Sequence, residues 1–219
     1  MLREEFRIDL ERLDAEVVVG GRDAQRAVHA ARALLEEYTP EDHELVVALD
    51  AVVRARYAAV EREIEVLLAR QAPVAIDLRR VLGALAVMRA FERIGRNARR
   101  VADLASPLPG LEGESEVIGH LQRMGATAEQ LVAEAVDVFQ ANDTIRAEQL
   151  ARRQDTFDDE GAQLLDTVIA TSADSELRPW CMRMLIAARW FERIVDHAAN
   201  VGERTVYRLT GERRQIDTP

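Results

Sequence analysis

Three oxygen-bearing side chains follow one another at helical spacing near the C-terminal end of the sequence. Glu192, Asp196 and Asn200 are four residues apart, while Ile194 and Ala198 repeat at core spacing. In a helix this spacing places the oxygens in one column, and oxygen ligands suit a hard or borderline cation. The alternative is a solvated helix face, since acids at this spacing commonly pair with neighbouring arginines.

An earlier copy of this segment lies 100 residues upstream. Phe91 to Ile94 repeats as Phe191 to Ile194, and the flanking residues align without a gap. Such self-similarity predicts an internal duplication. The copies differ where the chemistry would occur, because Asp196, His197 and Asn200 correspond to Arg96, Asn97 and Arg100.

The duplication extends to a second pair of segments. Asp155 and Asp159 form another pair of acids four residues apart, and the corresponding residues of the first half are Asp50 and Arg54. In both segments, therefore, the first half has an arginine where the second half has an acid.

The composition is typical of a helical protein. The 219 residues are 48% hydrophobic and 31% charged, and the sequence contains no lysine. The net charge of −10 argues against non-specific nucleic-acid binding, which depends on neutralising phosphates.

Cys181 is the only cysteine, which excludes an intramolecular disulfide and a thiolate metal cage. The charged N-terminus lacks an apolar signal-peptide segment and no run is long enough to span a membrane, so we expect a cytoplasmic protein.

Helix caps and breakers predict an all-α fold made of two tandem three-helix bundles. Thr39-Pro40 is typical of a helix start, and Gly20-Gly21 is expected to bend the first helix. The expected helices cover about 2–36, 40–70, 74–105, 112–141, 143–171 and 176–210. The proline- and glycine-rich segment 106–113 is the predicted linker between a bundle at 1–105 and a bundle at 114–219.

The remaining aromatic and histidine residues have structural interpretations. We expect Trp180 and Trp190 to pack in the second core. His29, His43 and His120 have no acidic or histidine neighbour at ligand spacing, and we expect them on the surface.

Four stretches of the sequence resemble the PhoU family, whose members are regulators attached to bacterial and archaeal phosphate uptake. Gln71 to Arg79 is similar to the family's Q-x-P-V-A-x-D-L-R helix start, and Phe191 to Asn200 to its L-E-R-I-x-D-H-A-x-N signature. Val206 to Glu212 is similar to the closing V-Y-L-V-T-G-E, and Arg3 to Arg7 to the opening helix. The resemblance covers essentially the whole chain and includes the duplication.

The resemblance implies metal clusters held by E/D-x-x-x-D pairs on two facing helices of each bundle. In the second bundle the matching ligands are Asp155, Asp159, Glu192 and Asp196. His197 and Asn200 also match the motif, either as additional ligands or as side chains that orient the ligands, and His197 has a purely structural alternative. The resemblance does not distinguish among Fe, Zn, Mn and Mg as the bound ion.

The first bundle departs from the family's pattern. It retains Asp50 and Glu92 but has Arg54 and Arg96 in place of the partner acids. Two guanidinium groups can satisfy two carboxylates directly. We therefore expect this site to be an internal salt-bridge cluster that binds no metal.

The resemblance also implies a function without catalytic turnover. The expected protein is an adaptor that couples a phosphate ABC transporter to its sensor histidine kinase and restrains the phosphate-starvation response and phosphate uptake. Its long amphipathic helices also favour self-association, and we expect a homodimer. An alternative is a carboxylate-bridged metalloenzyme on a helical bundle, although such sites use Glu-x-x-His pairs and the acids here are four residues apart. A third interpretation is a structural helical protein whose acids face solvent.

Overall fold

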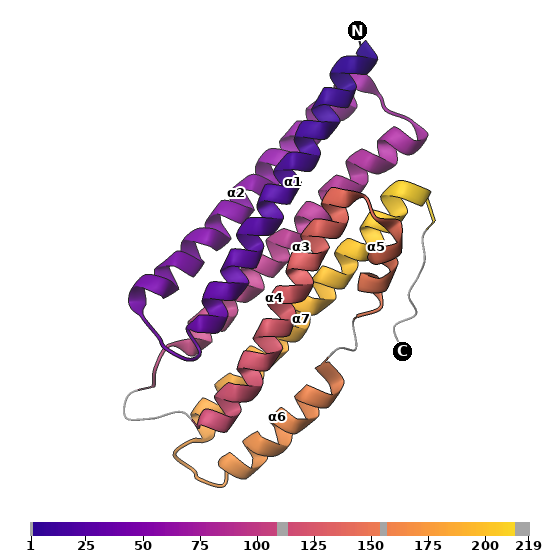
Figure 1. Cartoon of the computed structure of the whole chain (residues 1–219). Coiled ribbons are helices and arrows are strands. Elements are labelled where there is room, and N and C mark those ends of the chain that lie inside the picture. Colours follow the sequence, from indigo (N-terminus) through magenta and orange to yellow (C-terminus); the bar gives the residue numbers. More distant parts are fainter. Residues whose placement is uncertain (1, 109–113, 154–156, 213–219) are drawn as a thin grey trace.

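The computed structural model describes residues 2–108, 114–153 and 157–212, and every regular element in these ranges is an α-helix. The helices are α1 Leu2–Ala33, α2 Pro40–Gln71, α3 Ala75–Ala105, α4 Ser115–Ala141, α5 Thr144–Ala151, α6 Asp158–Thr171 and α7 Arg178–Thr210. The helices α1, α2 and α3 pack against one another, and α4 to α7 form the second group (Figure 1). The all-α prediction is confirmed.

The predicted helix start at Thr39-Pro40 is confirmed, and cap residues also mark the start of α5 and the end of α7. The Thr39 hydroxyl accepts a hydrogen bond from the backbone N–H of Asp42 at 3.1 Å, ahead of Pro40 in the first turn of α2. The Asp143 carboxylate accepts from the N–H of Arg146 at 3.0 Å and begins α5. Gly211 ends α7 with φ +82°, a left-handed conformation that glycine adopts without steric cost.

The prediction that the fifth helix is one continuous element is wrong. It is divided into α5 and α6, which lie near opposite ends of α7 (Figure 1), although no proline or glycine separates them in the sequence. Each piece has its own anchor. A Cβ atom on Gly202 would lie 2.5 Å from the carbonyl oxygen of Ala147, so α5 approaches α7 at backbone distance, whereas α6 is tied to α4 by polar contacts of Glu160.

The two bundles share one hydrophobic core. Helix α3 packs against α7, and α1 packs against α4, so the equivalent helices of the two repeats lie side by side (Figure 1). Phe91 and Phe191 are both fully buried in the same cluster. Trp180 is buried there as predicted, whereas Trp190 is only partly buried and lies under the Arg100 guanidinium, 4.2 Å from its ring centre. The division at 106–113 stays a prediction, because residues 109–113 lie outside the described ranges.

Arg208 of α7 is the most deeply buried charged residue of this interface. Its side chain is fully buried, donates a hydrogen bond of 2.5 Å to Asp14 of α1, and lies 4.4 Å above the Phe139 ring of α4. A Cβ atom on Gly83 of α3 would lie 2.6 Å from the Arg208 Cβ. One side chain therefore connects α7 with three other helices.

The expected bend at Gly20-Gly21 is wrong. Helix α1 continues through both glycines, and both are buried. A Cβ atom on Gly21 would lie 2.6 Å from Cγ2 of Val136 and 2.8 Å from the ring of Phe91. The glycine pair therefore serves close helix packing, because side chains of α3 and α4 occupy the space above it.

We predict that Gly21→Ala destabilises the protein by about 1–3 kcal/mol, because the added methyl group overpacks the junction of α1, α3 and α4. Chemical denaturation measures the change in unfolding free energy. The control is Gly119→Ala in α4, where an added Cβ would meet only the tip of Arg123 at 3.6 Å. That change should stabilise the protein by up to about 1 kcal/mol through helix propensity. Stabilisation by both substitutions would show that Gly21 is a flexible point after all.

Candidate functional site

The first-bundle acid Asp50 is held between arginines of two helices. Its side chain is buried on α2, and its Oδ2 lies 3.3 Å from Nε of Arg54 and 3.4 Å from Nη1 of Arg99 on α3. Its other oxygen is buried and has no hydrogen-bond partner among the described residues. The charge of this carboxylate is therefore balanced by guanidinium groups.

The second acid of the first bundle, Glu92, has the same kind of surroundings. It is buried on α3, accepts a hydrogen bond from Arg96, and lies 3.6 Å from Nε of Arg93. Both arginines that replace acids in this half are thus ion-paired with the carboxylates that remain. That this site binds no metal stays a prediction.

The four predicted ligands of the second bundle are only partly placed. Asp155 lies outside the described residues, and Asp159 is exposed on α6. Glu192 on α7 accepts a hydrogen bond from Arg189, and α6 passes close by, since a Cβ on Gly161 would lie 4.0 Å from Glu192 Oε1. Among the described residues, no three acidic, histidine or cysteine side chains are close enough to hold a metal together. A site composed of the predicted ligands would therefore depend on Asp155.

Asp196 is the second-bundle acid with the most unusual environment. It is half-buried, and desolvation raises the pKa of its carboxyl group above the ordinary value. Arg193 and Arg189 oppose this shift, whereas the negative charge of Glu192 adds to it. Two carboxylates close together on a helix would gain from a cation that offsets their repulsion.

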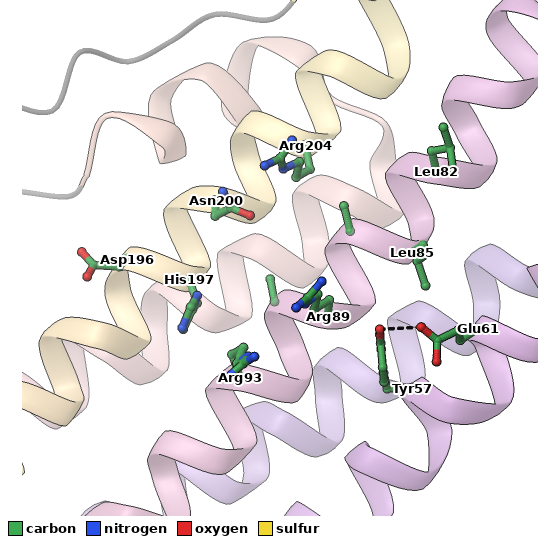
Figure 2. Close-up of a pocket in the computed structure, with 12 residues that line it drawn as sticks. Tyr57, Glu61, Leu82, Leu85, Arg89, Arg93, Asp196, His197, Asn200 and Arg204 are labelled. Atoms are coloured by element: carbon green, nitrogen blue, oxygen red, sulfur yellow. Dashed lines mark hydrogen bonds between the residues drawn. The ribbon is translucent and has the colours of Figure 1, made fainter.

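A wide groove runs between α2, α3 and α7 on the side of His197. Its main cavity has a volume of about 750 Å³, and the charged groups lining it include Arg89, Arg93 and Arg204 (Figure 2). His197 points toward α3, whereas Asp196 points away from the arginines (Figure 2). Burial and then the charges of Arg93 and Arg193 lower the pKa of His197 to about 4, so the ring is neutral at neutral pH.

Asn200 lies one turn after Asp196 on the groove side of α7 (Figure 2), and its Nδ2 donates to Glu203 at 3.4 Å. The column of oxygens read from the sequence is therefore divided in space. Asp196 points outward, and Asn200 lines the cavity together with His197. The sequence does not predict the groove, because residues of three helices from both bundles line it. Only the spacing of Arg89 and Arg93 within one helix is visible in the sequence.

The expectation that His120 lies on the surface is wrong. It is buried on α4, with Nδ1 2.8 Å from Oε1 of Glu160 and Nε2 3.3 Å from the Thr167 hydroxyl, both on α6. Arg123 donates to the same Glu160 oxygen at 2.9 Å. This network holds α6 against α4, and the sequence does not reveal it because the partners are 40 residues apart.

The other two histidines also pair with acids of distant helices. Nδ1 of His29, which is exposed as expected, lies 3.0 Å from Glu129, and Nε2 of His43 lies 2.8 Å from Asp103. Cys181 is buried, and burial raises the pKa of its thiol, which disfavours the reactive thiolate. None of the helices in the described ranges combines the length and the apolar character that a membrane crossing needs.

The fold and the ion-paired repeat define a duplicated helical-bundle protein, and comparisons with known proteins identify its class. A model of the PhoU domain matches residues 20–105 and again residues 121–205. The chain therefore belongs to the PhoU family, and the sequence-based recognition of that family is confirmed.

Curated relatives and solved structures agree with this assignment. The chain is 32% identical to phosphate-specific transport system accessory protein PhoU homolog 2 of Mycobacterium tuberculosis over 92% of each chain. It is 25% identical to the PhoU homolog of Clostridium acetobutylicum over 99% of each. The crystal structure of PhoU from Pseudomonas aeruginosa superposes with a TM-score of 0.88 at 25% identity, covering 94% of this chain and all of that one. These relatives are named as accessory proteins of phosphate transport rather than as enzymes.

We predict that Glu160→Gln destabilises the protein by about 1–2 kcal/mol at pH 7, because hydrogen bonds to a charged group are lost at a partly buried site. Burial alone would raise the pKa of Glu160, but hydrogen bonds from His120 and Arg123 outweigh it and lower the pKa. A lowered pKa means that the contribution is complete above the unfolded-state value of about 4.3 and is lost as the pH falls through the folded-state value.

The difference between the wild type and Glu160→Gln should therefore disappear at strongly acidic pH in urea denaturation curves. The matched control is Asp166→Asn, which removes an exposed acid from the same helix and should change little at any pH. A difference for Glu160→Gln that persists unchanged at pH 3 would contradict the assigned role of the Glu160 charge.

Proposed function

We propose that this protein is a regulatory adaptor of phosphate uptake that couples a phosphate ABC transporter to its sensor kinase in the cytoplasm. When phosphate is plentiful, it restrains both uptake and the expression of starvation genes. The observation that carries the proposal is the double match to the PhoU domain, at 20–105 and 121–205. The relatives' names, which refer to accessory roles in phosphate transport, support it.

The second bundle has exposed apolar side chains that could contact another protein. Leu165 and Ile169 are exposed one turn apart on α6, and Met182 and Ile186 are exposed one turn apart on α7. Exposed apolar stripes of this kind are typical of surfaces that receive a partner. They suit a helix of the transporter, of the kinase or of a second copy of the chain.

A metal ion at the second bundle is part of the proposal. Its support is the acid pair Glu192 and Asp196 on one face of α7, the raised pKa of Asp196, and the proximity of α6 to Glu192. Asp159 and Asp155 would complete an oxygen-rich ligand set that suits Fe, Zn, Mn or Mg. Such an ion would screen the acids and hold α6 on α7.

We predict that deleting the gene in its source organism raises expression of a phosphate-starvation reporter in phosphate-rich medium toward the level of starved cells. The physical reason is that the link between transporter and kinase is lost. Reporter activity and phosphate uptake are measured with and without a plasmid copy of the gene. A deletion strain that keeps the reporter silent in rich medium, with unchanged uptake, would refute the regulatory role.

We predict that elemental analysis of the purified protein finds one or more Fe, Zn, Mn or Mg ions per chain, and that Asp196→Arg removes them. This substitution gives the second bundle the residue that the first bundle has at Arg96. The control is Asp137→Arg, at an exposed acid of α4, which should keep the metal. An apo wild type, or equal metal content in both variants, would remove the metal from the proposal.

A further inference from the structure

Two adjoining cavities form one continuous groove along α3. The larger has a volume of about 750 Å³ and the smaller about 500 Å³, and they share Tyr57, Glu61, Arg89 and Arg93. The volume of the larger cavity alone lies within the range of about 300–1,000 Å³ that small-molecule sites occupy. We refer to it as the α3 groove.

The α3 groove is rich in arginine, in a chain whose net charge is −10. Five guanidinium groups line it, whereas only three acids do, namely Glu61, Glu92 and Asp196. The arginines are Arg54, Arg89, Arg93, Arg96 and Arg204. Arg54 and Arg96 are the residues that stand where the second repeat has Asp159 and Asp196.

The arginines differ in how far they are already neutralised. Arg54 is ion-paired with Asp50, and Arg96 and Arg93 are ion-paired with Glu92. Arg89 of α3 and Arg204 of α7 have no carboxylate within ion-pair distance in the part of the chain that the structure describes, and both are exposed. Two guanidinium groups with available donors therefore face the groove from opposite bundles.

The acids of the groove offset part of this charge. Glu61 accepts a hydrogen bond of 2.9 Å from the Tyr57 hydroxyl (Figure 2). Asp196 points away from the arginines (Figure 2), and its charge partners are Arg193 and Arg189 of its own helix.

We propose that the α3 groove binds a small phosphate-bearing anion between Arg89 and Arg204. Guanidinium forks bind phosphate oxygens with two parallel hydrogen bonds, and a recess concentrates the field of its charges. Arg93, the ring of His197 and the Asn200 amide lie in the same cavity as further polar groups. Leu82 and Leu85 form an apolar wall that can contact the organic group of a larger ligand. Inorganic phosphate and nucleotides both carry the phosphate group that the arginines would bind.

This site adds a ligand to the proposed adaptor without depending on that role. It lies where α3 and α7 meet, so a bound anion would bridge the two bundles. Its test uses purified protein alone and is separate from the genetic test of regulation.

The test is isothermal titration of the full-length protein with inorganic phosphate, tripolyphosphate and ATP, at near-physiological salt. We expect one site per chain for at least one of these probes. The double variant Arg89→Gln, Arg204→Gln should weaken binding about tenfold or more, since each lost charge-assisted hydrogen bond costs about that much. Arg89→Lys keeps the charge without the fork and should weaken binding less.

The control is Arg146→Gln, which removes the same charge from an exposed position of α5 outside the groove and should leave the affinity within about twofold. Binding of any of the three probes would support the site. The probe that binds most tightly would identify the class of phosphate compound that the site recognises. Equal weakening by Arg146→Gln, or no binding of any probe at millimolar concentration, would overturn the proposal. Thermal unfolding of each variant verifies that it is folded.

Discussion

The packing of α3 against α7 is the constraint on which the rest of the structure depends. These helices are the equivalent elements of the two repeats, and their contact merges two bundles into one core. Gly83 permits the approach because the Arg208 side chain fills the space where its Cβ would be. Arg208 also bonds to Asp14 of α1 and lies over Phe139 of α4. The relative positions of the repeats, and hence the α3 groove, follow from this packing.

The two halves of the duplication differ in charge, and the second half has α5 and α6 where the first half has α2. In the first half, Arg54 and Arg96 neutralise the buried acids Asp50 and Glu92. In the second half the corresponding positions have remained acidic, and desolvation and Glu192 raise the pKa of Asp196. Because carboxylates attract cations and guanidinium groups attract oxyanions, our account proposes a cation site in the second repeat and an oxyanion site between the two repeats.

Features encoded within one segment could be predicted from the sequence, and features created by packing could not. The helix start at Thr39-Pro40 indicates the helix type, and the repeated Phe-Glu-Arg-Ile segment indicates the duplication. The break between α5 and α6 has no local signal, because Gly202 and the His120 network impose it from other helices. The same limit applies to the α3 groove, whose charged walls belong to both bundles, and to Gly21, whose neighbours come from α3 and α4.

The most direct test of these two sites is one anomalous diffraction experiment on crystals containing Mn²⁺ and tungstate, a heavy substitute for phosphate. The account predicts a tungstate peak in the α3 groove between Arg89 and Arg204, and a manganese peak beside Glu192 and Asp196. Manganese at Asp50 and Glu92, or tungstate beside Glu192 with none in the groove, would contradict it.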